Sequence, residues 1–199
     1  MAIQVFNTVL TQAEKKGILA KNAEEARNWL REKAKTFRSA DPTRMIQQGA
    51  DRNRVQTKVG QMFLFKYDAK MKGELPYYDM FPLVFPFRRV SGGFYGINLH
   101  YLHPTYRALL MDSLYDVLNN GNADETTKLR ITYNILNSSA KFKWFKPCVK
   151  HYLNSQVESR FIYIQPNEWD VALFLPLQRF RGATAAQVYR DSRRQVTGR

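Results

Sequence analysis

The chain has 199 residues, a length typical of one domain with at most an appended arm, and its 44% hydrophobic content excludes wholesale disorder. It holds 31 Lys and Arg against 17 Asp and Glu, a formal net charge of +14. This excess disfavours an ordinary metabolic enzyme and favours an anionic partner, which is nucleic acid, an anionic membrane or an acidic protein. The 13 Phe, 11 Tyr and 3 Trp suit both a compact core and stacking on bases. A single Cys excludes an intramolecular disulfide and fits a reducing compartment.

The positive charge is concentrated at the two ends of the sequence. Residues 1–60 hold 12 basic and 6 acidic side chains, and residues 141–199 hold 11 and 4, whereas residues 61–140 hold 8 and 7. The start of the chain lacks the basic and apolar regions of a signal peptide, and no uninterrupted apolar stretch is long enough to span a bilayer. We therefore expect a soluble protein with no membrane partner, made in the cytoplasm of its host cell.

Residues 1–59 are predicted to form a basic helical arm and linker, followed by a globular α+β domain at residues 60–199. Asn22 followed by Glu25 has the spacing of a helix cap with an acidic residue three positions later, so we expect a helix to begin near Asn22. Residues 39–58 carry few large apolar side chains and include a proline and a glycine. We interpret them as an extended linker that orders only against a partner.

Three strands are predicted at the start of the globular part, at residues 61–67, 81–89 and 94–102. Residues 68–73 and Ser91-Gly-Gly93 have the composition of tight turns between them. The second strand contains two prolines, which interrupt a hydrogen-bonded ladder, so it should lie at a sheet edge or bend sharply. Strands joined by such short connections predict a small antiparallel, barrel-like (SH3-like) sheet.

Helices are predicted to dominate the rest of the chain. Residues 105–118 carry an apolar stripe, and Asp124 is placed to cap a second helix. Residues 157–164 are predicted to form a returning strand, residues 166–174 a short helix, and residues 183–196 a final basic helix. The predicted fold class is α+β, a barrel-like sheet packed with several helices plus the basic N-terminal helical arm.

Motifs of enzymes are not found in the sequence. It contains no glycine-rich phosphate loop, no nucleophile elbow and no His-Glu-x-x-His motif. A nuclease needs clustered carboxylates to hold metal, and the closest grouping, Asp112 and Asp116, has the spacing of a solvated helix face. We predict that the protein is not an enzyme and uses no cofactor.

Two residue pairs have the spacing of zinc ligands. They are His100 with His103, and Cys148 with His151. Two unlike pairs on different elements are a weak signal, and core roles for His100 and Cys148 explain them better. We predict no metal site.

Residues 141–150 are the segment most suggestive of nucleic-acid binding. Four lysines alternate there with Phe142, Trp144 and Phe145, and lysines neutralise phosphates while aromatic faces stack on exposed bases. Alternatively, the aromatic side chains point into the core and the lysines form the solvated side of an amphipathic turn. A second basic cluster lies in and just before the last helix, where the alternative is a solvated helix face. The candidate DNA-contacting residues are Lys141, Lys143, Trp144, Lys146, Lys150, Arg160, Arg179, Arg181, Arg190, Arg193, Arg194, Arg88 and Arg89.

Several segments together resemble one protein family, the DNA end protector proteins of T4-like tailed phages. The similarity covers about residues 60–195, and the first 60 residues match no family. Its central part is carried by Lys66-Tyr-Asp-Ala-Lys70, Leu75-Pro-Tyr-Tyr-Asp-Met-Phe-Pro-Leu83 and Gly93-Phe-Tyr-Gly-Ile-Asn-Leu-His-Tyr-Leu102. It continues through Tyr133-Asn-Ile-Leu136, Phe145-Lys-Pro-Cys-Val-Lys-His-Tyr152, Ser159-Arg160-Phe161 and Glu168-Trp169-Asp170.

The resemblance implies a structural virion protein that binds the end of the packaged double-stranded DNA. It further implies shielding of that end from exonucleases during head completion, a location in the head-neck region of the virion, and contacts with portal, neck or head-completion proteins. It supplies no catalytic residues. Two alternatives stay open at this point. One is a structural neck or tail connector whose basic surface binds other virion subunits, and the other is a nuclease or another DNA-processing enzyme.

Overall fold

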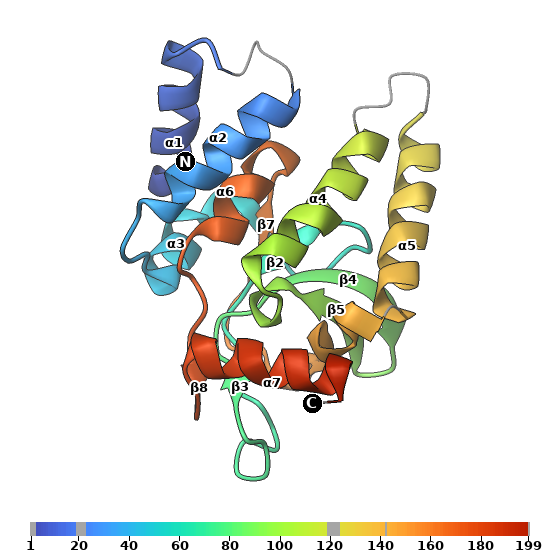
Figure 1. Ribbon diagram of the computed structural model, residues 1–199. Helices are drawn as coiled ribbons and strands as arrows, with labels where there is room; N and C mark the ends of the chain where they lie inside the picture. The colour runs from blue at the N-terminus through green and yellow to red at the C-terminus, as the bar shows by residue number, and fades with distance from the viewer. Residues whose placement is uncertain (1–2, 19–22, 119–123, 142, 199) are drawn as a thin grey trace.

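The computed structural model describes residues 3–18, 23–118, 124–141 and 143–198, and it combines α-helices with an antiparallel sheet (Figure 1). The helices are α1 (Gln4–Lys15), α2 (Ala23–Lys35), α3 (Pro42–Gln48), α4 (Pro104–Leu118), α5 (Glu125–Lys141), α6 (Trp169–Phe174) and α7 (Ala185–Thr197). The strands are β1 (Asn53–Arg54), β2 (Met62–Leu64), β3 (Tyr78–Asp79), β4 (Leu83–Val90), β5 (Gly93–Asn98), β6 (Val149–Leu153), β7 (Phe161–Ile164) and β8 (Phe180–Arg181). Short 3-10 segments include η1 (Ala50–Arg52), η2 (Leu99–Tyr101) and η3 (Lys143–Cys148).

The main sheet has the strand order β1-β7-β2-β4-β5-β6, and all its pairings are antiparallel. Within the described ranges β1 and β6 are its two edges and do not pair with each other, so the sheet is open. A second, two-stranded sheet pairs β3 with β8. The prediction of a mixed α and β fold is confirmed, whereas closure into an SH3-like barrel is not found.

Strand β4 lies in the centre of the sheet, between β2 and β5, so the predicted edge position is wrong. Pro86 lies inside β4, and the sheet tolerates it because the hydrogen-bonded pairing of β4 with β5 is irregular there. The register shifts between Pro86 and Arg88. The carbonyl oxygen of Pro86 accepts a hydrogen bond from the Gly60 backbone amide at 3.2 Å. The predicted turn between β4 and β5 is confirmed, since Val90 pairs with Gly93 and Gly92 has a φ of 73°.

Both faces of the sheet are covered, because all three residues of β2 are buried. Leu64 belongs to the core beneath the helices, together with Phe85, whose ring centroid lies 4.9 Å from that of Trp169. Phe63 and Phe65 face the opposite side. They belong to a separate aromatic cluster with Tyr67, Tyr78, Phe94, Tyr152 and Phe161. The predicted Phe63, Phe65 and Tyr67 alternation is therefore confirmed as one buried face.

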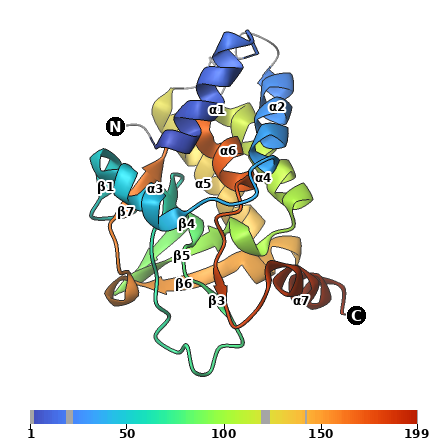
Figure 2. The same cartoon turned by 90° about the vertical axis from the view of Figure 1, so that its left-hand side faces the viewer.

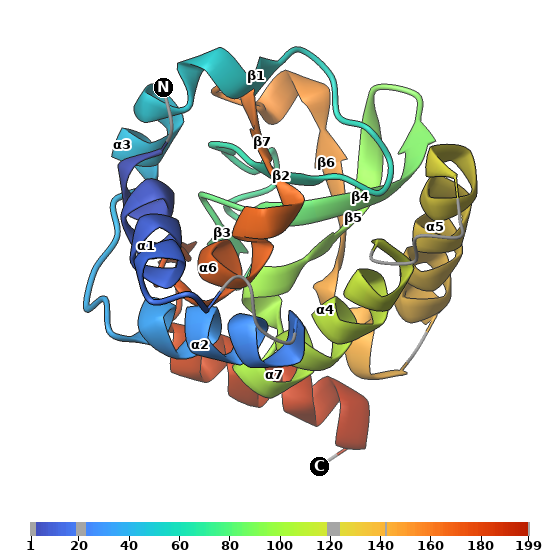
Figure 3. The same ribbon diagram turned by 90° about the horizontal axis from the view of Figure 1, so that it is seen from above.

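The N-terminal helices are part of the same core as the sheet. Phe6 of α1 and Leu30 of α2 are buried in one hydrophobic cluster with residues of β2, β4 and α6. Figures 2 and 3 show α1 and α2 beside α6 and show β1 alongside β7. The N-terminal helices and α6 thus pack together over the sheet.

The interpretation of residues 39–58 as an extended linker is wrong. They form α3, η1 and β1, and Asp41 caps α3 by accepting a hydrogen bond from the Thr43 amide at 2.9 Å. Sequence composition misled here because the segment is anchored by only a few apolar contacts, including Pro42 and Met45, and by strand pairing. The cap predicted at Asn22 lies outside the described residues. The division into residues 1–59 and 60–199 stays a prediction.

Two ion pairs fasten the N-terminal part to α6. Arg31 Nε donates to Asp170 Oδ1 at 2.6 Å, and both side chains are buried. Arg31 Nη2 also contacts Asp112 Oδ1 at 2.7 Å, so the Asp112 carboxylate is paired rather than simply solvated. Arg52 Nη1 contacts Glu168 Oε2 at 2.6 Å. Burial raises the pKa of Asp170 and the Arg31 guanidinium opposes this shift, so the pair depends on both partners.

Most of the predicted later elements are confirmed. The helices at residues 104–118 and 125–141 are present, and Asp124 Oδ1 accepts a hydrogen bond from the Thr127 amide at 2.7 Å, as expected of a cap. The returning strand, the short helix after Pro166 and the final helix are present as β7, α6 and α7.

We predict that Gly93→Ala destabilises the protein by about 3 kcal/mol or more, because a Cβ there would lie 2.1 Å from the Tyr152 carbonyl oxygen on β6. Gly73→Ala is the matched control, since no atom lies within 4 Å of the position of its added Cβ. Urea unfolding of both variants measures the difference. Equal stability of the two variants would contradict the pairing of β5 with β6.

We predict that Arg31→Met lowers the free energy of unfolding by about 3 to 5 kcal/mol, because it leaves the buried Asp170 carboxylate without its partner. Lys35→Met breaks the exposed pair with Glu32 on the same helix and should cost less than about 1 kcal/mol. Denaturant titration measures the free energy of unfolding of the two variants. Equal values would contradict the prediction and would indicate an N-terminal part that detaches without affecting the rest of the fold.

Candidate nucleic-acid interface

A basic groove lies between the last helix and the 3-10 segment that precedes β6. It encloses about 690 Å³ and is lined by Lys143 of η3 and by Arg190, Arg193, Arg194 and Thr197 of α7. All four cationic side chains are exposed. The sequence-predicted clusters at residues 141–150 and in the last helix therefore meet along one groove, although they are about forty residues apart in the chain.

Helix α7 presents its arginines to this groove because of its spacing. The Thr184 side chain accepts a hydrogen bond from the Gln187 amide at 3.3 Å and caps the first turn. Val188 and Val196 are buried against the body of the protein. The three arginines occupy positions three and four residues apart and so form one exposed face.

A buried arginine ties α7 to the body of the protein. Arg107 of α4 is 2% exposed, and its Nη2 donates to Tyr189 Oη on α7 at 2.6 Å. Its Nε donates to the backbone carbonyl oxygen of Leu102 (2.8 Å) and its Nη1 to that of Leu173 (2.6 Å), while Nη2 also donates to that of His100 (3.3 Å). Burial lowers the pKa of Arg107, and Tyr189 opposes this shift. The buried Arg107 therefore fixes the position of α7, and with it the position of the groove arginines.

A carboxylate network next to Arg107 fixes the segment that leads into α7. Asp79 Oδ2 lies 2.6 Å from His100 Nδ1 and accepts from Asn98 Nδ2 at 3.2 Å. Asp79 Oδ1 accepts from the backbone amides of Phe81 (3.1 Å) and Arg179 (3.2 Å). Burial lowers the pKa of His100, and the Asp79 carboxylate opposes this shift. The network joins β3, the end of β5 and the chain before β8.

The residues of the possible zinc site have other surroundings. His100 contacts Asp79, and the His151 ring stacks on Tyr95 with 4.7 Å between centroids. Cys148 is fully buried, and burial raises the pKa of its thiol to about 12, which keeps it protonated. His103 is exposed. Across the described residues no three His, Cys, Asp or Glu side chains converge as a metal site would require.

Other members of the 141–150 segment have different environments. Lys141 and Lys146 are exposed beside the groove residues. Lys150 is partly buried with its Nζ 3.9 Å from the centre of the Tyr101 ring, and burial lowers its pKa. Phe145 packs against the main core, which favours the alternative interpretation for that side chain. The side chains of Phe142 and Trp144 lie outside the part of the structure that is described.

The remaining predicted contacts lie away from the groove. Arg160 is exposed just before β7, on the side of the sheet that carries β1. The Arg179 guanidinium donates to the carbonyl oxygens of Pro176, Gln178 and Ala40, so we assign it a structural role.

Arg181 is exposed on β8. Arg88 lies over the Tyr95 ring, and Arg89 donates to the Thr57 carbonyl oxygen.

The groove carries an excess of positive charge. Among the described residues, Lys143, Arg190 and Arg193 have no ion-pair partner, and Arg194 has only a long contact of 4.0 Å with Asp191. The buried carboxylates are already engaged elsewhere, Asp79 with His100 and Asp170 with Arg31. Cations without partners in a concave site attract a polyanion and leave no carboxylate set to hold a catalytic metal.

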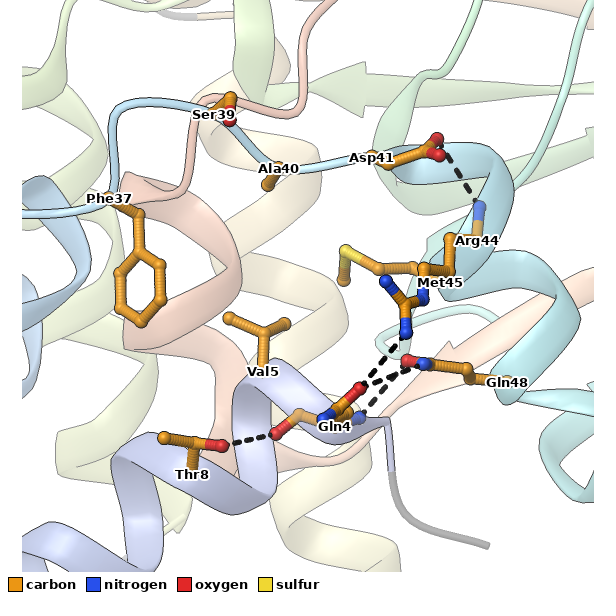
Figure 4. A pocket seen from close by; sticks show the side chains of 10 residues that line it. All are labelled: Gln4, Val5, Thr8, Phe37, Ser39, Ala40, Asp41, Arg44, Met45 and Gln48. Carbon is orange, nitrogen blue, oxygen red and sulfur yellow. Dashed lines mark hydrogen bonds between the residues drawn. The ribbon is translucent and has the colours of Figure 1, made fainter.

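Another cavity, of about 410 Å³, lies between α1, α3 and the segment that joins α2 to α3 (Figure 4). Its polar groups bond one another: the Gln4 backbone N–H donates to Gln48 Oε1 at 3.1 Å, and Arg44 Nη2 donates to Gln4 Oε1 at 3.5 Å. Asp41 is used as the cap of α3. These partners account for the polar groups of the cavity, and we assign no function to it.

A cationic groove along the last helix, with almost no acidic neighbours, is the electrostatic footprint of a nucleic-acid-binding protein. Comparison with known families agrees: the family model for the Phage T4 terminal DNA protecting protein matches residues 5–193, and the chain belongs to this family. The match confirms the resemblance and extends it over the N-terminal helices. No curated protein and no solved structure matched the chain. None of the described helices has the length and apolarity needed to cross a membrane.

Proposed function

We propose that the protein binds the end of the packaged double-stranded DNA through the basic groove and shields it from exonucleases by occupying the terminus. The observation that supports this most directly is the convergence of Lys143, Arg190, Arg193 and Arg194 on one groove. Lys141 and Lys146 are also exposed and supply further cations from the same stretch of sequence as Lys143. Cations that contact phosphates bind without regard to sequence, which is what protection of a DNA end requires.

Protection in this proposal needs no catalysis. A protein that covers the terminus blocks a nuclease that must begin there, and binding alone supplies the effect. The buried acids Asp79, Glu168 and Asp170 hold structural partners, which supports a non-enzymatic role. We further propose that the protein acts in the head-neck region during head completion, in contact with portal, neck or head-completion proteins.

The salt dependence of DNA binding tests whether the groove residues contact phosphates. The variant replaces Lys143, Arg190, Arg193 and Arg194 together by Gln. Its slope of log affinity against log salt on duplex DNA should be flatter by about three to four units, because each lost phosphate contact reduces the slope by about 0.9. The control replaces four exposed cations on other segments, Lys15, Arg38, Lys58 and Lys70, and keeps the same net charge. It should change the slope by less than about one unit.

Both variants must be compared near physiological salt, because a chain with a net charge of +14 adheres to any DNA at low salt. Equal effects of the two sets of substitutions would mean diffuse attraction without a site. The alternative, a structural connector that binds acidic virion subunits, would then be favoured.

A further inference from the structure

Three planar side chains form a continuous stack across three neighbouring strands at one end of the main sheet. The guanidinium carbon of Arg88 on β4 lies 4.5 Å from the centre of the Tyr95 ring on β5. The ring of His151 on β6 stacks on Tyr95 with centroids 4.7 Å apart and an angle of 15° between planes. We call these three residues the Arg88–Tyr95–His151 stack.

The strand register produces the stack. Arg88 pairs with Tyr95, and Tyr95 pairs with His151, so the three side chains project from the same face in a row perpendicular to the strands. Arg88 and His151 are both exposed, and Tyr95 is half-buried.

The stack is open on the side of His151. Among the described residues strand β6 is an edge of the sheet and no strand follows His151 in the row, while Tyr95 covers the inner face of its ring. The outer face of the imidazole therefore offers a flat surface at the periphery of the molecule. Stacking on such a ring is available to every nucleobase, because all bases have a π face.

Two exposed lysines lie on the segment that leads into this edge strand. The segment η3, which carries Lys143 and Lys146, leads directly into β6 and packs against both β5 and β6. Neither Arg88 nor His151 has an ion-pair partner among the described residues. Cationic groups next to an exposed aromatic face are the combination by which proteins hold single-stranded nucleic acid.

We propose that an unpaired base at the DNA terminus stacks on the outer face of His151 and extends the Arg88–Tyr95–His151 stack, while its phosphate is neutralised from η3. The proposal rests on the proposed function, because the groove must first hold the duplex. It gives the protein a means of distinguishing an end from internal duplex, since only a frayed or overhanging terminus presents a free base. It also places the base-stacking role on β5 and β6 rather than on Phe145, which packs in the core.

The test compares two DNA duplexes that differ only in their bases. One ends in a short single-stranded overhang of adenines, and the other has abasic sugars in the overhang, so that both carry the same phosphates. The wild-type protein should bind the adenine overhang about fivefold or more tightly than the abasic one near physiological salt. A fluorescent adenine analogue, aminopurine, at the first unpaired position should be quenched on binding.

Variants at the outer position identify the surface. His151→Leu should reduce the ratio of the two affinities to about one, and His151→Phe should retain it, because only the second keeps a planar face. Affinity for a blunt duplex should change by less than about twofold in both variants. His103→Leu, at the other exposed histidine, is the control and should leave the ratio unchanged.

Each outcome decides the proposal. A ratio of one in the wild-type protein, or a ratio that His151→Leu leaves unchanged, overturns it. If blunt duplex is still bound through the groove in that case, the proposed function stands and only the stacking site fails. If the wild-type protein binds no duplex near physiological salt, both proposals fail.

Discussion

The burial of one positive charge organises the part of the molecule that we propose meets DNA. Arg107 is almost completely enclosed, and a cation in such a place is stable only if its donors are satisfied. Three backbone carbonyl oxygens and the Tyr189 hydroxyl satisfy them, and Tyr189 belongs to the helix that carries the groove arginines. Helix α7 is thus held to the core through its own neutral Tyr189 hydroxyl, and this contact uses none of the groove arginines.

The same arrangement explains how a chain with so large a net charge forms a compact structure. Acidic side chains form ion pairs in the interior, where Asp170 pairs with Arg31 and Glu168 pairs with Arg52. These pairs fasten the N-terminal part of the chain to α6 and to the residue before it. Cations at the groove have almost no acidic neighbours among the described residues. The buried acids Asp170 and Glu168 therefore contribute to folding and do not neutralise the groove.

Local signals in the sequence predicted much of the C-terminal two thirds of the fold. Asp124 as a cap, Gly92 in a turn and the alternation of Phe63 with Phe65 each depend on neighbouring residues alone, and each is confirmed. The central position of β4 depends on which strands pair, and prolines argued locally for the edge. The N-terminal helices were missed as core elements. Charged residues dominate the composition of α2, and in both helices a few residues such as Phe6 and Leu30 carry the contact.

The candidate site was predictable only in part, because its members come from separate parts of the sequence. The two lysine and arginine clusters could be seen in the sequence, but their convergence on one groove required the packing of α7 against η3. Arg179 looked like a member of the basic cluster, yet its guanidinium holds three backbone carbonyls. The stack of Tyr95 with His151 was not predicted, since it arises from strand register between residues more than fifty positions apart.

Protection of linear DNA from a terminal exonuclease tests the central claim most directly. Saturating wild-type protein should slow digestion near physiological salt, and linear DNA should compete for the protein better than a closed circle of equal length. The variant with Gln at Lys143, Arg190, Arg193 and Arg194 should neither protect nor discriminate. Unchanged digestion at saturation, or equal competition by the circle, would contradict end protection through this groove.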